Sequence, residues 1–298
     1  MKLNVIPQLS DRGAERLRIA ALLAPALIVI VVLFIGGLAS GFLRSLNYFP
    51  LIGLVNPNLD AYFSIFTDKE FYLSLVLTFY IAFVSTVIST VLAIGAALLL
   101  RRALRGKRIV NLFFSLNLTI PHLVGAIGIL YLISQSGIFS RLTTSVGVTD
   151  HPADFPALVA DPFAFGIILT YVWKETPFIG VIVLAILLSV GEDYESVARS
   201  LGAKGWQAFR FVTLPLIGPG VGSAFFIVFA FTFGAFEVPY LLGQTYPSAL
   251  PVLAYESYSD VDLGGRPRAM AMAMVIAALS AIAIIAYTKL SRRYIRNG

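Results

Sequence analysis

The sequence of 298 residues contains no cysteine and only two histidines. Without cysteine, no disulfide framework, thiolate nucleophile or thiolate metal site can form, and two histidines alone suggest no metal cluster. The chain also lacks the G-x-x-x-x-G-K-[ST] loop that cradles ATP phosphates. We therefore expect no catalytic residues, no metal and no cofactor. Any energy from ATP would have to come from another chain.

Charge is scarce as well. Only 13% of the residues are charged, 58% are hydrophobic and the mean hydropathy is +0.86, which is far from the composition of a soluble domain. Six apolar stretches reach the roughly 20 residues that a helix needs to cross a bilayer. They are 19–43, 71–100, 109–140, 162–190, 211–236 and 269–288, and Lys174 and Glu175 interrupt 162–190. Because the stretches are continuously apolar rather than alternating, we predict an all-α membrane protein with six transmembrane helices.

Basic residues gather in four segments that share one side of this topology. Segments 1–18, 101–108, 190–218 and 289–298 hold 16 of the 22 lysines and arginines. Such an excess marks the cytoplasmic side, so both termini are predicted to be cytoplasmic. The net charge of +6 is thus a topology signal, and we expect no nucleic-acid partner beside the membrane lipid.

The polar connections set the helix boundaries. The first apolar stretch is too long for a signal peptide and has no small-residue cleavage site, so we predict a retained helix. The expected helices are about 17–43, 72–100, 109–134, 162–189, 219–242 and 267–288, with Pro121 near the centre of the third. A short surface helix is expected within 135–161. The chain then divides into a cytoplasmic segment 1–18, a transmembrane domain 19–289 and a cytoplasmic tail 290–298.

Segment 190–218 is the one cytoplasmic connection long enough for its own structure. We predict a helix over about 193–201, a turn at Gly202, where glycine permits positive φ, and a second helical piece over about 204–212 that stops before Pro215. An apolar face would be formed by Val197, Leu201, Trp206, Phe209 and Val212. Two interpretations stay open: an amphipathic helix on the lipid surface, or a docking element for a partner protein.

The same segment carries a resemblance to a known family. Leu214 and Pro215 follow Gly202 by twelve and thirteen residues, with "ARSLGA" before and "FRFVTLP" after them. This spacing resembles the EAA loop of the membrane subunits of bacterial binding-protein-dependent ABC importers. In that family the loop lies between the fourth and fifth of often six membrane helices, and its short coupling helix inserts into the cytoplasmic ATPase.

The resemblance implies the machinery and the coupling residues. Expected partners are two ATPase subunits, a second permease subunit of a different chain and an extracytoplasmic solute-binding protein, all at the bacterial inner membrane. The family's glutamate usually stands six residues before the glycine, where this chain has Ser196, and whether the neighbouring Glu195 replaces it stays open. The implied ATPase-coupling residues are Glu195, Ser196, Ala198, Leu201, Gly202, Ala203, Phe209, Leu214 and Pro215.

Two further stretches are similar to one subgroup of the family. "YVWKETPF" at 171–178 and "FGAFEVPYLLG" at 233–243 resemble the subgroup of spermidine/putrescine importers. Near relatives of that subgroup are similar to carriers of iron, thiosulfate or aminophosphonates. A secondary transporter without an ATPase is the alternative, but the sequence has no inverted repeat.

Polar residues within the predicted helices are candidates for the solute path, because a charge inside a bilayer is expensive. They are Asn117, His122, Trp173, Lys174, Glu175, Glu237 and Tyr240. Lys174 and Glu175 lie roughly 18 Å into their helix at 1.5 Å per residue, and Pro121 and Pro177 would free backbone carbonyls near that depth. Adjacent residues point about 100° apart, so Lys174 and Glu175 are expected to face different partners.

Each of these candidates has a plainer alternative. Lys174 and Glu175 would stabilise the bundle by pairing with neighbouring helices, Trp173 would be a packing residue, and Glu237 would be an interfacial acid beside Tyr240 in the aromatic belt. The acids favour a small organic cation as solute, whereas Lys174 and His122 favour an anion. The sequence predicts the cation.

Overall fold

The structure, a computed structural model, describes residues 9–102, 116–191 and 193–297. Within these residues every long element is helical, and six helical stretches are long and apolar enough to cross a membrane. They are Arg18–Ser45, Lys69–Arg101, His122–Ser145, Phe165–Val190, Gly205–Gly234 and Leu263–Lys289. The predicted all-α fold with six membrane spans is therefore confirmed.

Shorter elements subdivide these spans. The first half of the chain contains α1 (Leu9–Ile30), the π-helix η1 (Val31–Ile35), α2 (Gly36–Ser45), η2 (Pro50–Ile52), α3 (Asp60–Thr67), α4 (Lys69–Arg102), α6 (His122–Ile133), α7 (Ile138–Ser145) and η3 (Pro152–Asp154). The second half contains α8 (Phe165–Val190), α9 (Asp193–Ser200), α10 (Gly205–Ala208), the π-helix η4 (Phe209–Thr213), α11 (Leu214–Gly234), α12 (Glu237–Leu242), α13 (Leu250–Ser259), η5 (Leu263–Gly265) and α14 (Arg266–Asn297).

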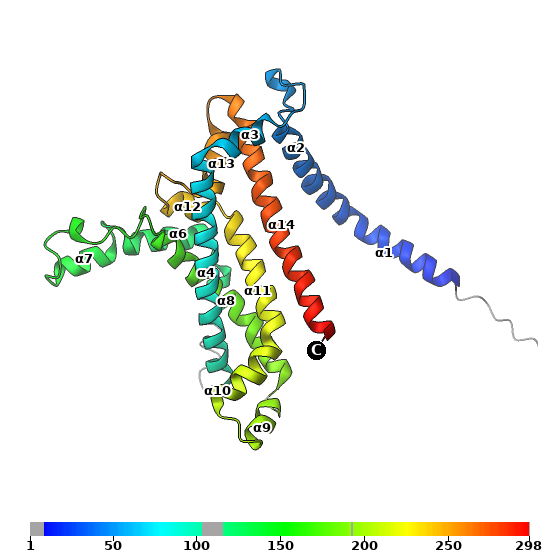
Figure 1. Ribbon diagram of the computed structural model, residues 1–298, viewed down its shortest axis with the longest axis vertical. Coiled ribbons are helices and arrows are strands. Elements are labelled where there is room, and N and C mark those ends of the chain that lie inside the picture. Colours follow the sequence, from blue (N-terminus) through cyan, green and yellow to red (C-terminus); the bar gives the residue numbers. More distant parts are fainter. Residues whose placement is uncertain (1–8, 103–115, 192, 298) are drawn as a thin grey trace, which may run out of the picture.

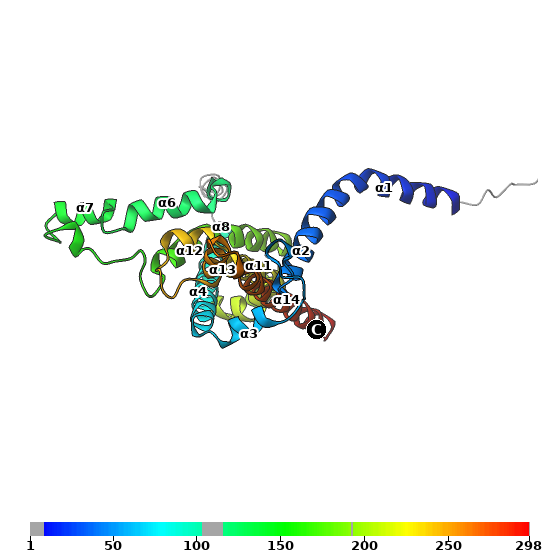
Figure 2. The ribbon, with the colours of Figure 1, turned by 90° about the horizontal axis from the view of Figure 1, so that it is seen from above.

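The long helices α4, α8, α11 and α14 form a bundle with two different ends. Figure 1 shows α9 and α10 at its lower end and α3 and α13 at its upper end. In both views α1 extends to one side of the bundle, and α6 with α7 extends to the other (Figures 1 and 2). Since α9 and α10 belong to the predicted cytoplasmic segment 190–218, the lower end corresponds to the predicted cytoplasmic side.

Small side chains let α4 pack closely on its neighbours. The buried positions along α4 include Ala82, Ser85, Thr86, Ser89, Thr90, Ala93 and Ala97. Several of the hydroxyls donate to a carbonyl one turn earlier, as Thr86 does to Ala82 at 2.6 Å. Each such bond satisfies a polar group without water, as the hydrocarbon region requires, and small residues allow helix backbones to approach.

The expected third helix is broken where the sequence predicted a continuous one. Residues 116–119 are helical, Pro121 is extended with ψ at 145°, and α6 begins only at His122. Proline lacks the N–H for an i−4 hydrogen bond and disfavours a helical conformation in the residue before it. Positions 103–115, which include the start of that expected helix, lie outside the described residues.

The fifth expected helix also differs. The second helical piece of segment 190–218 was expected to stop before Pro215, but α10, η4 and α11 continue into one another from Gly205 to Gly234. Pro215 sits in the first turn of α11, directly after the wider π-helical turn, where a missing N–H is tolerated. The helix then ends at Gly234, and Glu237 opens the separate helix α12 instead of lying inside a long one.

The terminal segments start and end differently from the expected boundaries. Helix α1 already begins at Leu9, and α14 continues to Asn297, so the described parts of the predicted cytoplasmic segments 1–18 and 290–298 are helical. Their ends, 1–8 and 298, lie outside the described residues. Within 135–161, where a short helix was expected, the structure has α7, which forms the end of the third candidate span.

Candidate functional site

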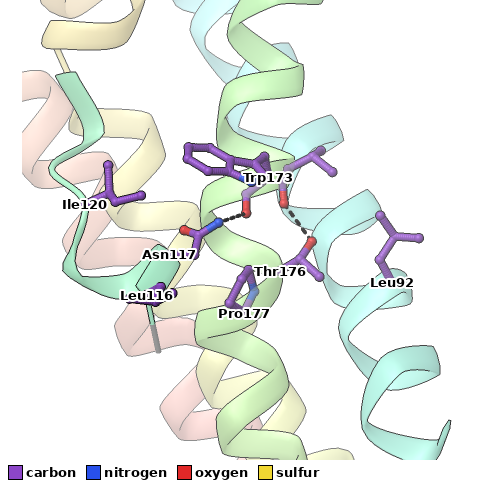
Figure 3. A pocket seen from close by; sticks show the side chains of 8 residues that line it. Leu92, Leu116, Asn117, Ile120, Trp173, Thr176 and Pro177 are labelled. Atoms are coloured by element: carbon purple, nitrogen blue, oxygen red, sulfur yellow. Dashed lines mark hydrogen bonds between the residues drawn. The ribbon is translucent and has the colours of Figure 1, made fainter. Parts of the chain in front are cut away.

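The interior of α8 contains a proline whose missing N–H is compensated from another segment. Pro177 cannot bond to the carbonyl of Trp173 one turn earlier. The side-chain Nδ2 of Asn117 donates to this carbonyl at 3.0 Å, as Figure 3 shows. The carbonyl freed by Pro177 is thus satisfied by the segment that leads into the Pro121 break.

The reverse arrangement holds at the break itself. Pro121 has no N–H to offer the carbonyl of Asn117, and the ammonium of Lys174 donates to that carbonyl at 2.5 Å and to the carbonyl of Ile120 at 2.7 Å. Lys174 is only 3% exposed. Each segment therefore satisfies backbone groups next to the other's proline, and the two proline sites form one interlocked polar joint, made of Asn117, Ile120, Pro121, Lys174 and Pro177.

Glu175 reaches the other side of the same break. Its Oε1 lies 2.8 Å from Nε2 of His122, the first residue of α6, and Glu175 is nearly buried while His122 is half-exposed. The His122 ring lies 4.9 Å from the ring of Phe231 on α11, measured between centroids. Lys174 and Glu175 thus have different partners, as expected, but both partners flank Pro121. The contacts of Lys174 agree with the alternative interpretation, in which this residue stabilises the helix bundle instead of lining the solute path.

Trp173 lies on a different side of α8 from Glu175. Residues two apart lie about 200° apart around a helix, so Trp173 and Glu175 leave α8 in different directions. Its ring is 2.8 Å from the place where a Cβ on Gly125 would stand. Trp173 lines a cavity of about 550 Å³ between α4 and α8 together with Leu92, Leu116, Asn117, Ile120, Val172, Thr176 and Pro177 (Figure 3). The candidate path residues therefore divide into two groups on opposite sides of α8.

Sequence reasoning missed Tyr171. Its hydroxyl is fully buried and has no hydrogen-bond partner among the described residues, and its ring lies 6.5 Å from that of His122, measured between centroids. Its position four residues before Glu175, on the same helix face, is the signal that could have revealed it. Tyr171 therefore lies beside the pair of Glu175 and His122.

An aromatic cluster lies beside Glu237. Glu237 and Tyr240 are both exposed, and the ring of Phe236 lies 4.9 Å from that of Tyr240 and 4.5 Å from that of Tyr255. The break between α11 and α12 therefore places one exposed carboxylate next to exposed aromatic faces.

The interlocked polar joint predicts that one substitution, Pro177→Ala, partly restores the stability lost through another, Asn117→Leu. Replacing Asn117 with leucine would leave the Trp173 carbonyl unpaired and should reduce the free energy of unfolding by about 1–3 kcal/mol. Adding Pro177→Ala supplies an N–H for this carbonyl and should recover part of the loss. Thermal unfolding of the purified protein in detergent measures both, with the exposed Thr119→Val as control. A double variant less stable than Asn117→Leu alone would contradict the joint.

The lower end of the bundle carries an exposed apolar face. Val197, Leu201 and Trp206 are exposed, Leu201 to 84%. Phe209 and Val212, expected on the same face, are half-buried. Two exposed rings that the sequence pattern did not single out, Tyr194 and Phe211, extend the apolar surface.

Gly202 forms the turn between α9 and α10. Its φ of +90° lies in the region that favours glycine, which confirms the predicted turn. Its N–H donates to the carbonyl of Arg199 at 2.9 Å, and that of Ala203 donates to Ala198 at 3.0 Å, so both cap the end of α9. Of the remaining expected coupling residues, Ser196 and Pro215 are exposed, while Ala198, Ala203, Phe209 and Leu214 are half-buried.

Glu195 points into the protein. Its Oε1 lies 2.9 Å from Nη1 of Arg101 and accepts a hydrogen bond from the Thr213 hydroxyl at 2.5 Å. Burial raises the pKa of Glu195, but the Thr213 hydrogen bond and the Arg101 charge outweigh burial and hold the pKa below its ordinary value. Glu195 is therefore an ionised, internally paired carboxylate at neutral pH.

Comparison with known proteins identifies the family. Residues 89–296 match the model of the family described as "Binding-protein-dependent transport system inner membrane component". The trehalose/maltose transport system permease protein MalF of Thermococcus litoralis is 26% identical over 271 residues, which is 88% of this chain and 89% of that protein. The molybdenum transport system permease protein ModB of Mycobacterium bovis is 26% identical over 243 residues, 79% of this chain and 86% of that protein.

The fold is shared with solved importers. A chain of a bacterial ABC transporter that imports the acidic polysaccharide alginate superimposes with a TM-score of 0.79 at 18% identity, covering 96% of this chain and 99% of that one. The predicted family is confirmed, and the spermidine/putrescine subgroup stays a prediction, since these relatives carry other names. The alternative of a secondary transporter is set aside. The chain belongs to the inner-membrane permeases of binding-protein-dependent ABC importers, multi-pass subunits that hydrolyse no ATP themselves and work with ATPase subunits and a periplasmic binding protein.

Proposed function

We propose that this chain forms one half of the solute path of an ATP-driven importer. It pairs with a second permease of a different chain, and two ATPase subunits dock below the bundle. The binding protein delivers solute to the opposite end. The observation that carries the proposal is the exposed apolar face of Tyr194, Val197, Leu201 and Trp206 at the predicted cytoplasmic end. An apolar surface of this kind suits a protein groove.

The path runs along the side of α8 that carries Glu175. His122 and Phe231 present half-exposed and exposed rings there, and the buried ring of Tyr171 lies 6.5 Å from that of His122. This strip crosses the Pro121 break and ends at the break between α11 and α12. Interrupted membrane helices are where transporters commonly place polar binding groups, which supports this assignment.

We propose that the solute is a small hydroxyl-rich molecule such as a sugar. The ammonium of Lys174 donates to two carbonyls, and the Glu175 carboxylate lies 2.8 Å from Nε2 of His122, so both side chains have partners within the protein. The exposed surface of the strip is mainly aromatic, through Phe231 and Tyr240. Aromatic faces with a few polar groups suit a sugar ring, and the similarity to the trehalose/maltose permease supports this choice.

An organic cation is the second candidate. Glu237 is exposed beside the rings of Phe236 and Tyr240, and a carboxylate next to aromatic faces attracts an ammonium group. This observation supports the polyamine-like organic cation that the sequence predicted as solute.

Titration of the cognate binding protein tests both candidates. Calorimetry with trehalose, maltose, spermidine, putrescine, molybdate and sulfate should show tight binding of a disaccharide, with a Kd at or below about 10 μM, equivalent to roughly 7 kcal/mol. Tight binding of spermidine or putrescine alone would favour the second candidate. Binding of only molybdate or sulfate would contradict both.

A further inference from the structure

The carboxylate of Glu195 joins the first turn of α9 to two other elements. It pairs with Arg101, near the end of α4, at 2.9 Å, and it accepts from Thr213 in η4 at 2.5 Å. The side chains of Glu195 and Arg101 are only 16% and 7% exposed. A charge-assisted pair shielded in this way has a defined geometry, unlike a solvated surface pair.

The same arginine also holds the end of α8. Nη2 of Arg101 donates to the carbonyl of Gly191 at 2.5 Å, and Gly191 ends α8 with a φ of +74°. The guanidinium therefore contacts both sides of the connection between α8 and α9. Three long helices, α4, α8 and the η4–α11 helix, meet at one ion pair.

Glu195 lies away from the face that we propose for docking. Tyr194, Val197 and Leu201 have the spacing i, i+3 and i+7 of one helix face, and all three are exposed. Glu195 is two residues from Val197, about 200° around the helix, and is turned towards α4. An incoming ATPase would thus meet the apolar face and leave the carboxylate where it is.

We propose that Glu195 is a positioning residue that fastens the coupling segment 190–218 to the inner end of α4, and that it makes no contact with the ATPase. The inference rests on the proposed docking of the ATPase at α9. A displacement of α9 is carried by the Glu195–Arg101 pair into α4, which packs along α8. Since α8 carries Lys174 and Glu175, this route leads from the docking face to the interlocked polar joint.

The test uses the complete importer in lipid vesicles, with Glu195→Ala, Arg101→Ala and the double variant. Each single variant should lower the maximal solute-stimulated rate of ATP hydrolysis by about tenfold, because either change removes the charge-assisted pair that joins α9 to α4. The double variant should be no worse than the poorer single variant, since both remove the same interaction. The apparent affinity for added ATPase subunits should change less than about twofold for all three, because the apolar docking face is intact.

Two matched variants of the same segment complete the experiment. Asp193→Asn removes an exposed acid of α9 and should retain the stimulated rate, whereas Leu201→Asp should weaken the apparent ATPase affinity by about tenfold or more. If Glu195→Ala weakens that affinity as strongly as Leu201→Asp, or if the two single effects add in the double variant, the positioning role is overturned. A lower Tm with an unchanged ratio of stimulated to basal hydrolysis would overturn it too, as this would leave a purely structural pair.

A different result would show that the ATPase does not dock at α9. If Leu201→Asp leaves ATPase affinity unchanged, the docking face has been misassigned. The non-additivity of the Glu195 and Arg101 variants is measured independently and would still report whether the pair acts as a unit.

Discussion

Replacing Lys174 with methionine should destabilise the protein by roughly 2–4 kcal/mol. The ammonium donates to the carbonyls of Asn117 and Ile120 beside the Pro121 break. Methionine would leave the Ile120 carbonyl without this bond and the Asn117 carbonyl with only the N–H of Ile120 at 3.2 Å, at about 1–3 kcal/mol for the group that loses its donor and less for the other. We expect a lower Tm and a poor yield of assembled complex, as measured by thermal unfolding and by recovery of the ATPase subunits on purification.

Glu175→Gln should behave in the opposite manner. The amide can still hydrogen-bond to His122, so assembly should be retained, while solute uptake in vesicles should fall by about tenfold, the kinetic equivalent of roughly 1.4 kcal/mol. Thr176→Val is the matched control, since Thr176 bonds only within α8, to Val172, among the described residues. Normal stability of Lys174→Met would contradict the interlocked joint, and normal uptake by Glu175→Gln would remove Glu175 from the path.

Gly202→Val should uncouple ATP hydrolysis from transport. A Cβ at Gly202 would meet no atom of the described residues within 4 Å, so the effect comes from the backbone alone. Holding a β-branched residue at a φ of +90° is strained by about 1–3 kcal/mol, and the turn should relax towards negative φ and move α9 relative to α10. The ratio of solute-stimulated to basal ATP hydrolysis measures the loss, which we expect to reach about tenfold.

A series of substitutions at this turn separates the effect of backbone strain at positive φ from the effect of added side-chain volume. Gly202→Asn should retain most of the coupling, because asparagine tolerates the left-handed region better than other residues. Gly205→Ala adds a Cβ in equally open space at a position without positive φ and should have little effect. Equal coupling in the Val and Asn variants would show that this turn has no part in coupling.

Much of the architecture follows from the sequence alone. The six apolar stretches predict six helices because a chain in lipid must satisfy its own backbone groups. The described residues contain six candidate spans, of which the third begins only at His122. Gly202 could be recognised as a turn because its sequence neighbours end one helix and begin another. The family was recognisable from the spacing between Gly202 and Leu214. In each case the signal lies within one continuous segment of the chain.

Other features depended on partners that are distant in sequence. A proline within an apolar run can kink, bend or break a helix, and the donor to the carbonyls at the Pro121 break is Lys174, 57 residues beyond Asn117. In the sequence, Glu195 resembles the family's motif glutamate displaced by one position. In the structure, its carboxylate faces the interior, where it accepts a hydrogen bond from Arg101, 94 residues earlier. The sequence determined which segments cross the membrane and where the coupling segment lies, because local hydrophobicity and backbone preference decide both. Only the tertiary structure decided which charges are paired, because pairing depends on which helices pack together.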